Sequence, residues 1–166
     1  MGMDNRIGKY FLHAGPGYGG SCFPKDTKAL IEIAKDHDYN FKIVKATEEV
    51  NDKQKQRPVQ ILKDFFNNLE YKTITILGLS FKPNTDDIRE APSLEVISEL
   101  LKENVKLSVF DPQAMPAVKN TFSSSKLTFF ENSYDAAQNS DAVIIMTEWN
   151  TFRDLDLKKL KSLMRT

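Results

Sequence analysis

The chain has 166 residues, of which 40% are apolar, and a mean hydropathy of −0.43, as expected for a globular chain of one or two small domains. Basic and acidic residues number 23 each, which excludes the strongly basic surface typical of nucleic-acid-binding proteins. The N-terminus lacks an apolar signal core, and no run approaches the roughly 18 apolar residues of a membrane-spanning helix. We therefore expect a cytoplasmic protein that binds neither nucleic acid nor membrane.

Glycine is concentrated near the N-terminus, where five of the seven glycines lie between Gly8 and Gly20. Clustered glycines allow positive φ angles and close approach of backbone to a ligand, so residues 13–22 predict either a ligand-contacting loop or a merely flexible one. Gly15, Gly17 and Gly20 match the spacing of the dinucleotide fingerprint. That fingerprint needs a strand before it and a helix opening within the glycines, and we reject it here because residues 21–24 intervene before a helix can begin.

Two helical stretches are expected next, one beginning near Pro24 and one from about Phe41 to Asn68. Pro58 predicts a kink or a break in the second stretch. The second stretch has an apolar stripe with little in the first 70 residues to cover it. The stripe therefore predicts packing against chain absent from this sequence or against a partner subunit.

From residue 72 onward the pattern alternates between short apolar strands and helices, with strands expected within 72–80, 105–112, 126–131 and 141–147. This order predicts an α/β fold, in which a helical central segment precedes a Rossmann-like three-layer parallel-sheet domain. We expect domains at 1–70 and 72–166. Ligands bind at the carboxyl ends of parallel strands, which indicates the segments 80–87, 111–112 and 147–149.

Cys22 is the sole cysteine, so an internal disulfide is excluded and the thiol is either structural or reactive. It precedes a predicted helix and lies near Lys25, a position that favours a nucleophilic thiolate. Asp26, four residues later, could reach the same ligand as a base, or could simply stabilise the first helical turn. A cysteine hydrolase is the weakest reading, because neither His13 nor His37 has the spacing of a catalytic dyad.

Two segments carry a specific resemblance. RIGKYFLHAGPGYGGSCFPKDTKAL (6–30) resembles the active-site segment of the UDP-glucose/GDP-mannose dehydrogenase family, and ILGLSFKPNTDDIREAPS (76–93) resembles the start of its UDP-binding domain. VFDP and TEWNTF follow at similar spacings. The resemblance implies oxidation of UDP-glucose to UDP-glucuronate with two NAD+, through a thiohemiacetal and a thioester on cysteine. It also implies a homodimer or higher homo-oligomer and no catalytic metal.

The family's functional residues transfer to matching positions of this chain. Cys22 is implied as the nucleophile, and Asp26 as the carboxylate that assists water or proton transfer. Lys25 and Arg89 are implied as contacts to the dinucleotide. The implied substrate-binding residues are Arg6 (toward the neighbouring subunit's site), Phe11, Leu12, His13, Ala14, Gly15, Gly19 and Lys82. For each cation the alternative is a solvated surface charge.

Parts of the family pattern are not found in this sequence, namely its N-terminal NAD-binding domain and its final strand with a DGR-type arginine. The resemblance therefore implies the C-terminal half of an enzyme, with NAD bound mainly by the absent domain, and no hydride transfer by this chain alone. Two alternatives remain open: a GDP-mannose 6-dehydrogenase, and a non-catalytic module that binds nucleotide or mediates oligomerisation.

Overall fold

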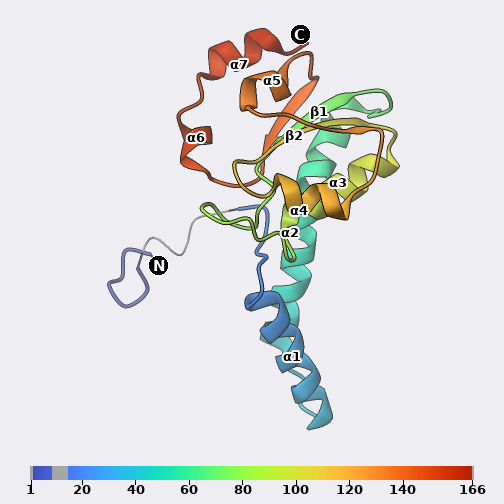
Figure 1. Cartoon of the computed structure of the whole chain (residues 1–166). Helices are drawn as coiled ribbons and strands as arrows, with labels where there is room; N and C mark the ends of the chain where they lie inside the picture. The colour runs from blue at the N-terminus through green and yellow to red at the C-terminus, as the bar shows by residue number, and fades with distance from the viewer. Residues whose placement is uncertain (1, 9–14, 166) are drawn as a thin grey trace.

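The computed structural model describes residues 2–8 and 15–165 (Figure 1). Within these ranges the elements are α1 (Phe23–Asp36), α2 (Lys42–Phe66), β1 (Thr73–Leu77), α3 (Pro92–Lys102), β2 (Lys106–Phe110), α4 (Met115–Thr121), β3 (Leu127–Phe129), α5 (Ser133–Ala137), β4 (Ala142–Ile145), α6 (Asn150–Arg153) and α7 (Leu157–Leu163). The expected strands all form, each in its predicted segment.

The four strands form one parallel sheet in the order β3-β2-β1-β4. Alternate side chains of β1 point to opposite faces, as the period of a strand requires. Ile74 and Ile76 join the larger apolar cluster, whereas Leu77 joins the smaller one, and Thr75 donates a hydrogen bond to the carbonyl of Ala136 in α5 at 2.7 Å. Both faces of the sheet are therefore buried.

Helices cover each face of the sheet. The larger cluster packs α2, α3 and α4 on one face, through buried side chains that include Val59, Ile97 and Val118. The smaller cluster packs α5 and α6 on the other, through Ala136 and Phe152. This confirms the expected three-layer Rossmann-like arrangement, in which burying each aliphatic side chain stabilises the fold by about 1.5–3 kcal/mol.

The long helix α2 differs from expectation in two ways. It runs without a break through Pro58, although proline removes one backbone hydrogen bond. Its apolar stripe is also covered in part within the chain, because Val59 and Leu62 are buried in the larger cluster with α3. The prediction of an uncovered stripe is therefore wrong for the C-terminal half of α2. In the N-terminal half, Ile43 and Val50 remain exposed.

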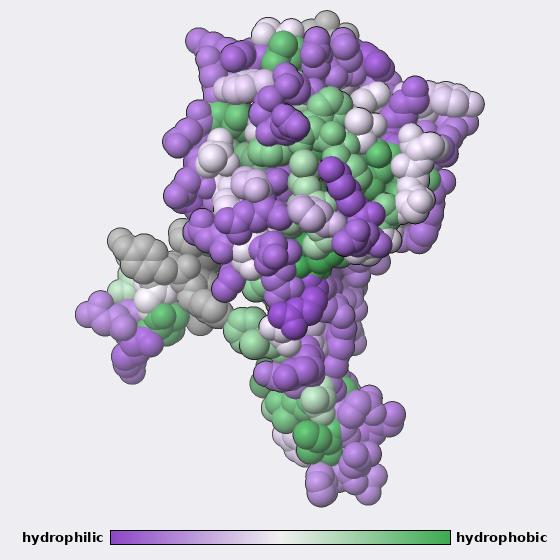
Figure 2. All heavy atoms as spheres, viewed as in Figure 1, coloured by the Kyte–Doolittle hydropathy of each residue, from purple (hydrophilic) through white to green (hydrophobic). Residues whose placement is uncertain are grey.

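Together α1 and the first half of α2 form a hairpin that projects from the sheet domain (Figure 1). Figure 2 shows apolar surface on this projecting part. It includes Leu30 and Ile33 of α1 and Ile43 of α2, whose exposed fractions are 41%, 55% and 78%.

The segments that follow β1, β2 and β4 meet at the carboxyl edge of the sheet. Asp111, which follows β2 and is 2% exposed, accepts hydrogen bonds from the Leu79 backbone N–H at 2.7 Å and the Trp149 Nε1–H at 3.1 Å. Gly78 has a φ of +91°, and a Cβ there would lie 2.6 Å from Thr147. Only glycine fits where β1 and β4 leave the sheet.

Candidate active site around Cys22

The glycine loop packs directly against the turn that precedes α3. A Cβ on Gly19 would lie 2.3 Å from the carbonyl oxygen of Glu90, and the Gly20 N–H donates to the Arg89 carbonyl at 2.8 Å. Gly20 also has a φ of +88°, and a Cβ there would overlap the Phe81 ring. These glycines are needed for close contact between two segments of the chain, so the loop is tightly packed at this end rather than merely flexible.

Tyr18 attaches the same loop to α2. Asn51, which is 4% exposed, accepts a hydrogen bond from the Tyr18 N–H at 2.7 Å and donates one to the Tyr18 carbonyl at 3.2 Å. The Tyr18 hydroxyl donates to the carboxylate of Glu48, which also accepts from Thr27 of α1. Burial, and next the hydrogen bond to Glu48, raise the pKa of Tyr18 to about 12. This network holds the loop, α1 and α2 together.

Cys22 lies immediately before α1, and its side chain is exposed. The Asp26 N–H donates to the Cys22 carbonyl at 2.9 Å, and the hydroxyl oxygen of Ser21 lies 3.8 Å from the Cys22 sulfur. The Asp26 carboxylate lies 3.4 Å from the ammonium of Lys25, and both side chains are well exposed. The thiol and the carboxylate thus occupy the first turn of α1, where unpaired backbone N–H groups favour negative charge.

A cationic cavity of about 630 Å³ lies beside the thiol, lined by Gly20, Ser21, Lys25, Lys28, Arg89 and Glu90. Asp87 holds the guanidinium of Arg89 through bonds of 3.0 Å to Nε and 2.7 Å to Nη2. The hydrogen bond to Asp87, the charge of Asp87 and, last, the charge of Cys22 raise the pKa of Arg89. Lys25 and Arg89 line this cavity together, and their contact with a dinucleotide stays a prediction.

A second cavity, of about 680 Å³, opens at the carboxyl edge of the sheet. It is lined by Gly15, Pro16, Gly17, Tyr18, Gly19, Phe23, Thr27, Thr47, Phe81, Pro92, Met146 and Glu148. Gly15 and Gly19 line this cavity, and their contact with a ligand stays a prediction. Lys82 is exposed, and its ammonium lies 5.3 Å from the ring centroid of the lining residue Phe81. Cys22 lines neither cavity, but its sequence neighbours do, Ser21 the first and Phe23 the second.

Five predicted substrate-binding residues remain, namely Arg6, Phe11, Leu12, His13 and Ala14. Arg6 pairs with Asp4 at 2.7 Å, its side chain is 88% exposed, and it lines neither cavity. Its expected site belongs to a neighbouring subunit. Phe11, Leu12, His13 and Ala14 lie outside the described residues.

Several residues around the site escaped the sequence analysis, notably Glu48, Asn51, Lys55 and Glu90. Asn51 and Lys55 are buried although they sit in a polar stretch of α2. The available signal was their spacing of four residues, which places them on one helix face. Phe81 was missed because an aromatic residue after a strand is ordinarily a core residue.

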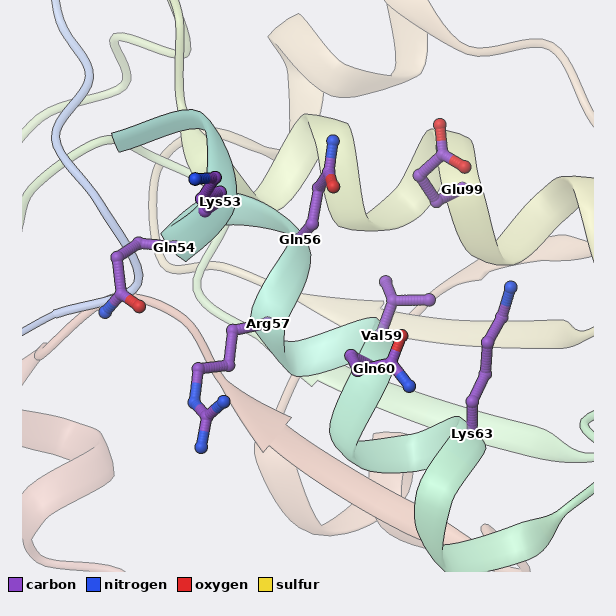
Figure 3. A pocket seen from close by; sticks show the side chains of 8 residues that line it. All are labelled: Lys53, Gln54, Gln56, Arg57, Val59, Gln60, Lys63 and Glu99. Carbon is purple, nitrogen blue, oxygen red and sulfur yellow. The ribbon is translucent and has the colours of Figure 1, made fainter. Parts of the chain in front are cut away.

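A third cavity, of about 420 Å³, is formed by α2 and α3 alone (Figure 3). It is lined by Lys53, Gln54, Gln56, Arg57, Val59, Gln60, Lys63 and Glu99. Arg57 and Lys63 point to different sides of α2 in Figure 3, and Lys63 forms an ion pair with Glu103. Because these two cations do not point toward a common ligand position, we interpret this cavity as a solvated polar surface of the helix pair.

Metal and membrane sites were sought across residues 2–8 and 15–165. No group of three or more His, Cys, Asp or Glu side chains there is placed to hold a metal ion. In the same ranges, no helix is both long enough and apolar enough to cross a membrane.

Sequence comparison now identifies the family. Residues 75–166 match the UDP binding domain of the UDP-glucose/GDP-mannose dehydrogenase family, and residues 1–53 match its central domain. The chain belongs to this family. The two matches agree with the geometry above, since the cysteine loop lies in the central-domain match and the sheet falls almost entirely in the UDP-binding match.

Curated relatives of the family align with the whole chain. A UDP-glucose 6-dehydrogenase of Rhizobium meliloti is 43% identical over 100% of this chain, which covers 38% of that relative. The UDP-glucose 6-dehydrogenase TuaD of Bacillus subtilis is 40% identical over 99% of this chain, which covers 36% of it. The chain therefore spans little more than a third of the length of these relatives.

Solved structures show the same fold. A UDP-glucose dehydrogenase from Pyrobaculum islandicum superposes with a TM-score of 0.87 at 37% identity, covering 93% of this chain and 36% of that one. A GDP-mannose dehydrogenase from Pseudomonas aeruginosa gives a TM-score of 0.76 at 25% identity, covering 93% of this chain and 37% of that one.

Proposed function

We propose that this chain is the C-terminal portion of a UDP-glucose 6-dehydrogenase, an enzyme that oxidises UDP-glucose to UDP-glucuronate with two NAD+. The observation that carries the proposal is the position of Cys22, an exposed thiol whose neighbours on either side line two different cavities. One cavity suits a nucleotide sugar, and the other suits the phosphates of a dinucleotide.

The nucleotide sugar is assigned to the cavity at the carboxyl edge of the sheet. The backbone of Gly15 and Gly19 faces it, and the preceding residues Phe11, Leu12, His13 and Ala14 are proposed to contact the nucleotide through their main chain. Lys82 is proposed to reach the pyrophosphate, where an ammonium group gains a charge-assisted contact. Arg6 is proposed to complete the site of a second subunit.

In the proposed chemistry Cys22 acts first as the nucleophile and later as the leaving group. After C6 of the sugar has lost its first hydride, the Cys22 thiolate adds to the aldehyde carbon and a proton goes to the carbonyl oxygen, giving a thiohemiacetal. Loss of the second hydride and of the hydroxyl proton leaves a thioester. Asp26 then takes a proton from water as the water oxygen attacks, and the carbon–sulfur bond breaks to release the uronate and restore the thiol.

Two NAD+, bound one after the other, would each accept one hydride. The cationic cavity fits the phosphates of NAD+, because Lys25, Lys28 and Arg89 line it. The glycine loop does not serve as a dinucleotide fingerprint, because α1 begins only at Phe23 and Gly19 and Gly20 are packed against Glu90 and Phe81. We therefore assign most NAD contacts to a domain outside this chain, and to this chain only Lys25 and Arg89.

The proposal extends to organisation and location. We assign residues 1–70 to the central domain and residues 72–166 to the UDP-binding domain, with α2 as their connection. The working unit is proposed to be a homodimer or higher homo-oligomer in the cytoplasm. A GDP-mannose 6-dehydrogenase ranks second, since the similar fold of the Pseudomonas aeruginosa enzyme comes with only 25% identity.

Calorimetric titration of the chain with UDP-glucose, GDP-mannose and NAD+ in parallel tests the assignment. We expect binding of UDP-glucose at about 0.1–1 mM, because part of a micromolar site lies outside this chain, and no binding of NAD+. Lys82→Ala should weaken UDP-glucose binding about tenfold, the effect of losing one charge-assisted contact. Preference for GDP-mannose would promote the second candidate, and absence of binding by all three would favour a non-catalytic module.

A further inference from the structure

Lys55 is a buried cation that the proposed chemistry does not use. It lies in α2, and its side chain is 5% exposed. Its ammonium lies 3.7 Å from a carboxylate oxygen of Glu90 and 4.0 Å from one of Glu95 in α3. Burying an unpaired ammonium has a large desolvation cost, and the ion pairs with these carboxylates offset that cost for Lys55.

Glu90 joins three parts of the molecule. The carboxylate oxygen that pairs with Lys55 also lies 3.3 Å from the ammonium of Lys28 in α1. The Glu90 carbonyl oxygen is the atom against which Gly19 packs. Glu90 thus links α1, α2 and the glycine loop at one point, directly beside Arg89.

The backbone of Glu90 is independent evidence that the position is constrained. Seven non-glycine residues in the described ranges have a positive φ, and five of them are Asn or Asp, which tolerate this conformation. Glu90, with a φ of 53°, is an exception. A glutamate in this conformation is strained, so the surrounding contacts have to enforce it.

We infer that Lys55 and Glu90 are positioning residues, which hold the 89–91 turn against the glycine loop and so place Arg89 beside Cys22. The inference rests on the proposed function, in which Arg89 and Cys22 belong to one site. Arg89 lines one cavity with Gly20 and Ser21, next to Cys22 in the sequence, and the Gly20 N–H bond to the Arg89 carbonyl is the direct link between the two segments. The ion pairs of Glu90 stabilise that contact from both helices.

The test measures the electrostatic potential at Cys22 through alkylation by two reagents of similar size. Iodoacetate is anionic and iodoacetamide is neutral. The rate constant for iodoacetate divided by that for iodoacetamide therefore reports nearby charge, and the intrinsic reactivity of the thiol cancels. Arg89→Gln should lower this ratio about threefold at low salt. If it does not, Arg89 is not beside the thiol, and both the cationic site of the proposed function and this inference are overturned.

Glu90→Gln distinguishes positioning from simple charge. If Glu90 acts only through its charge, Glu90→Gln removes a negative group and should raise the ratio of rate constants. If Glu90 positions Arg89, the same variant should lower the ratio toward the Arg89→Gln value. Glu32→Gln, which removes an exposed carboxylate paired with Lys35, is the matched control and should leave the ratio unchanged. Lys55→Met should act like Glu90→Gln, with Lys63→Met as its control on the same helix.

Folding of every variant is checked by far-UV circular dichroism. If Glu90→Gln does not fold, Glu90→Gly replaces it, because glycine accepts the positive φ while removing the carboxylate. A lowered ratio in the Glu90 variant with unchanged controls supports the inference. An unchanged or raised ratio, in a background where Arg89→Gln lowers it, overturns the positioning role and leaves the proposed function standing.

Discussion

At the scale of single residues, the site depends on glycines that permit contact between segments distant in sequence. Gly19 and Gly15 line the same cavity, yet their surroundings differ completely. A Cβ at Gly19 would lie 2.3 Å from the Glu90 carbonyl oxygen, whereas a Cβ at Gly15 would have no described residue within 4 Å. One glycine is therefore required by packing, and the other is available for ligand contact.

Substituting these two glycines separates packing from binding. Gly19→Ala should lower the free energy of unfolding by about 1–3 kcal/mol, because the backbone of Glu90 has to move to admit the methyl group. Gly15→Ala should leave it within about 0.5 kcal/mol, as at other sites without close neighbours. Urea denaturation of both variants provides the measurement. Equal stability of the two would contradict the packing at Gly19.

Tyr18 should make stability depend on alkaline pH. Its pKa is raised to about 12 by burial and by the hydrogen bond to Glu48. The folded state therefore holds the phenolic proton more tightly than the unfolded chain, whose tyrosine titrates near 10. The resulting stability is present in full below about pH 10 and is lost as pH rises toward about 12.

Tyr18→Phe removes the phenolic hydroxyl and with it the pH-dependent stability, so the variant serves as the reference for the wild type. It should lower the free energy of unfolding by about 1–3 kcal/mol at pH 7, through loss of a hydrogen bond to a carboxylate. The difference between wild type and variant should shrink between about pH 10 and 12. Thermal unfolding across that range measures it. A difference that stays constant with pH would show that the hydroxyl proton is not held by the fold.

At the scale of elements, α2 shows how packing overrides local propensity. Proline in a helix interior removes a backbone hydrogen bond and disfavours the helix by about 3 kcal/mol. The helix nevertheless continues through Pro58, because Val59 and Leu62 just beyond it are buried against the sheet domain. Tertiary burial holds the two halves of α2 in one helix.

Pro58→Ala should therefore stabilise the protein. Alanine restores the N–H of residue 58 as a donor and relieves the contact with the preceding turn, so the free energy of unfolding should rise by about 1–3 kcal/mol. Chemical denaturation compares the two proteins, with the exposed Gln56→Ala on the same helix as control. A loss of stability would mean that the proline ring makes packing contacts worth more than the missing hydrogen bond.

The contrast between local propensity and tertiary packing also explains which features could be predicted from the sequence. The strands, the helix after Pro92 and the placement of Cys22 before α1 follow from local periodicity and from proline at the first turn. The Lys55–Glu90 pair could not be found, because it joins positions 35 residues apart and depends on how α2 crosses the 89–91 turn. The burial of Val59 and Leu62 was missed for a similar reason, since their cover comes from α3.

At the scale of the whole molecule, the projecting α1–α2 hairpin carries apolar surface with no cover among the described residues. Ile43 is 78% exposed and Val50 is 58% exposed, and both line an apolar cavity of about 550 Å³ on α2 with Ala46 and Tyr18. Leu30 and Ile33 of α1 are exposed as well, and Figure 2 shows apolar surface on the projecting part. Contiguous apolar surface of this kind is typical of an interface.

The hairpin should therefore mediate self-association of the chain. Sedimentation velocity at tens of micromolar is expected to show a dimer or a larger species, because burial of this surface on a second copy would remove it from water. Ile43→Lys should shift the distribution toward monomer, since a charge in the interface has to be desolvated. Leu157→Lys, which replaces an apolar side chain on α7 that is 65% exposed, should not. A wild-type chain that stays monomeric over this range, or equal behaviour of the two variants, would place the subunit contact outside the hairpin.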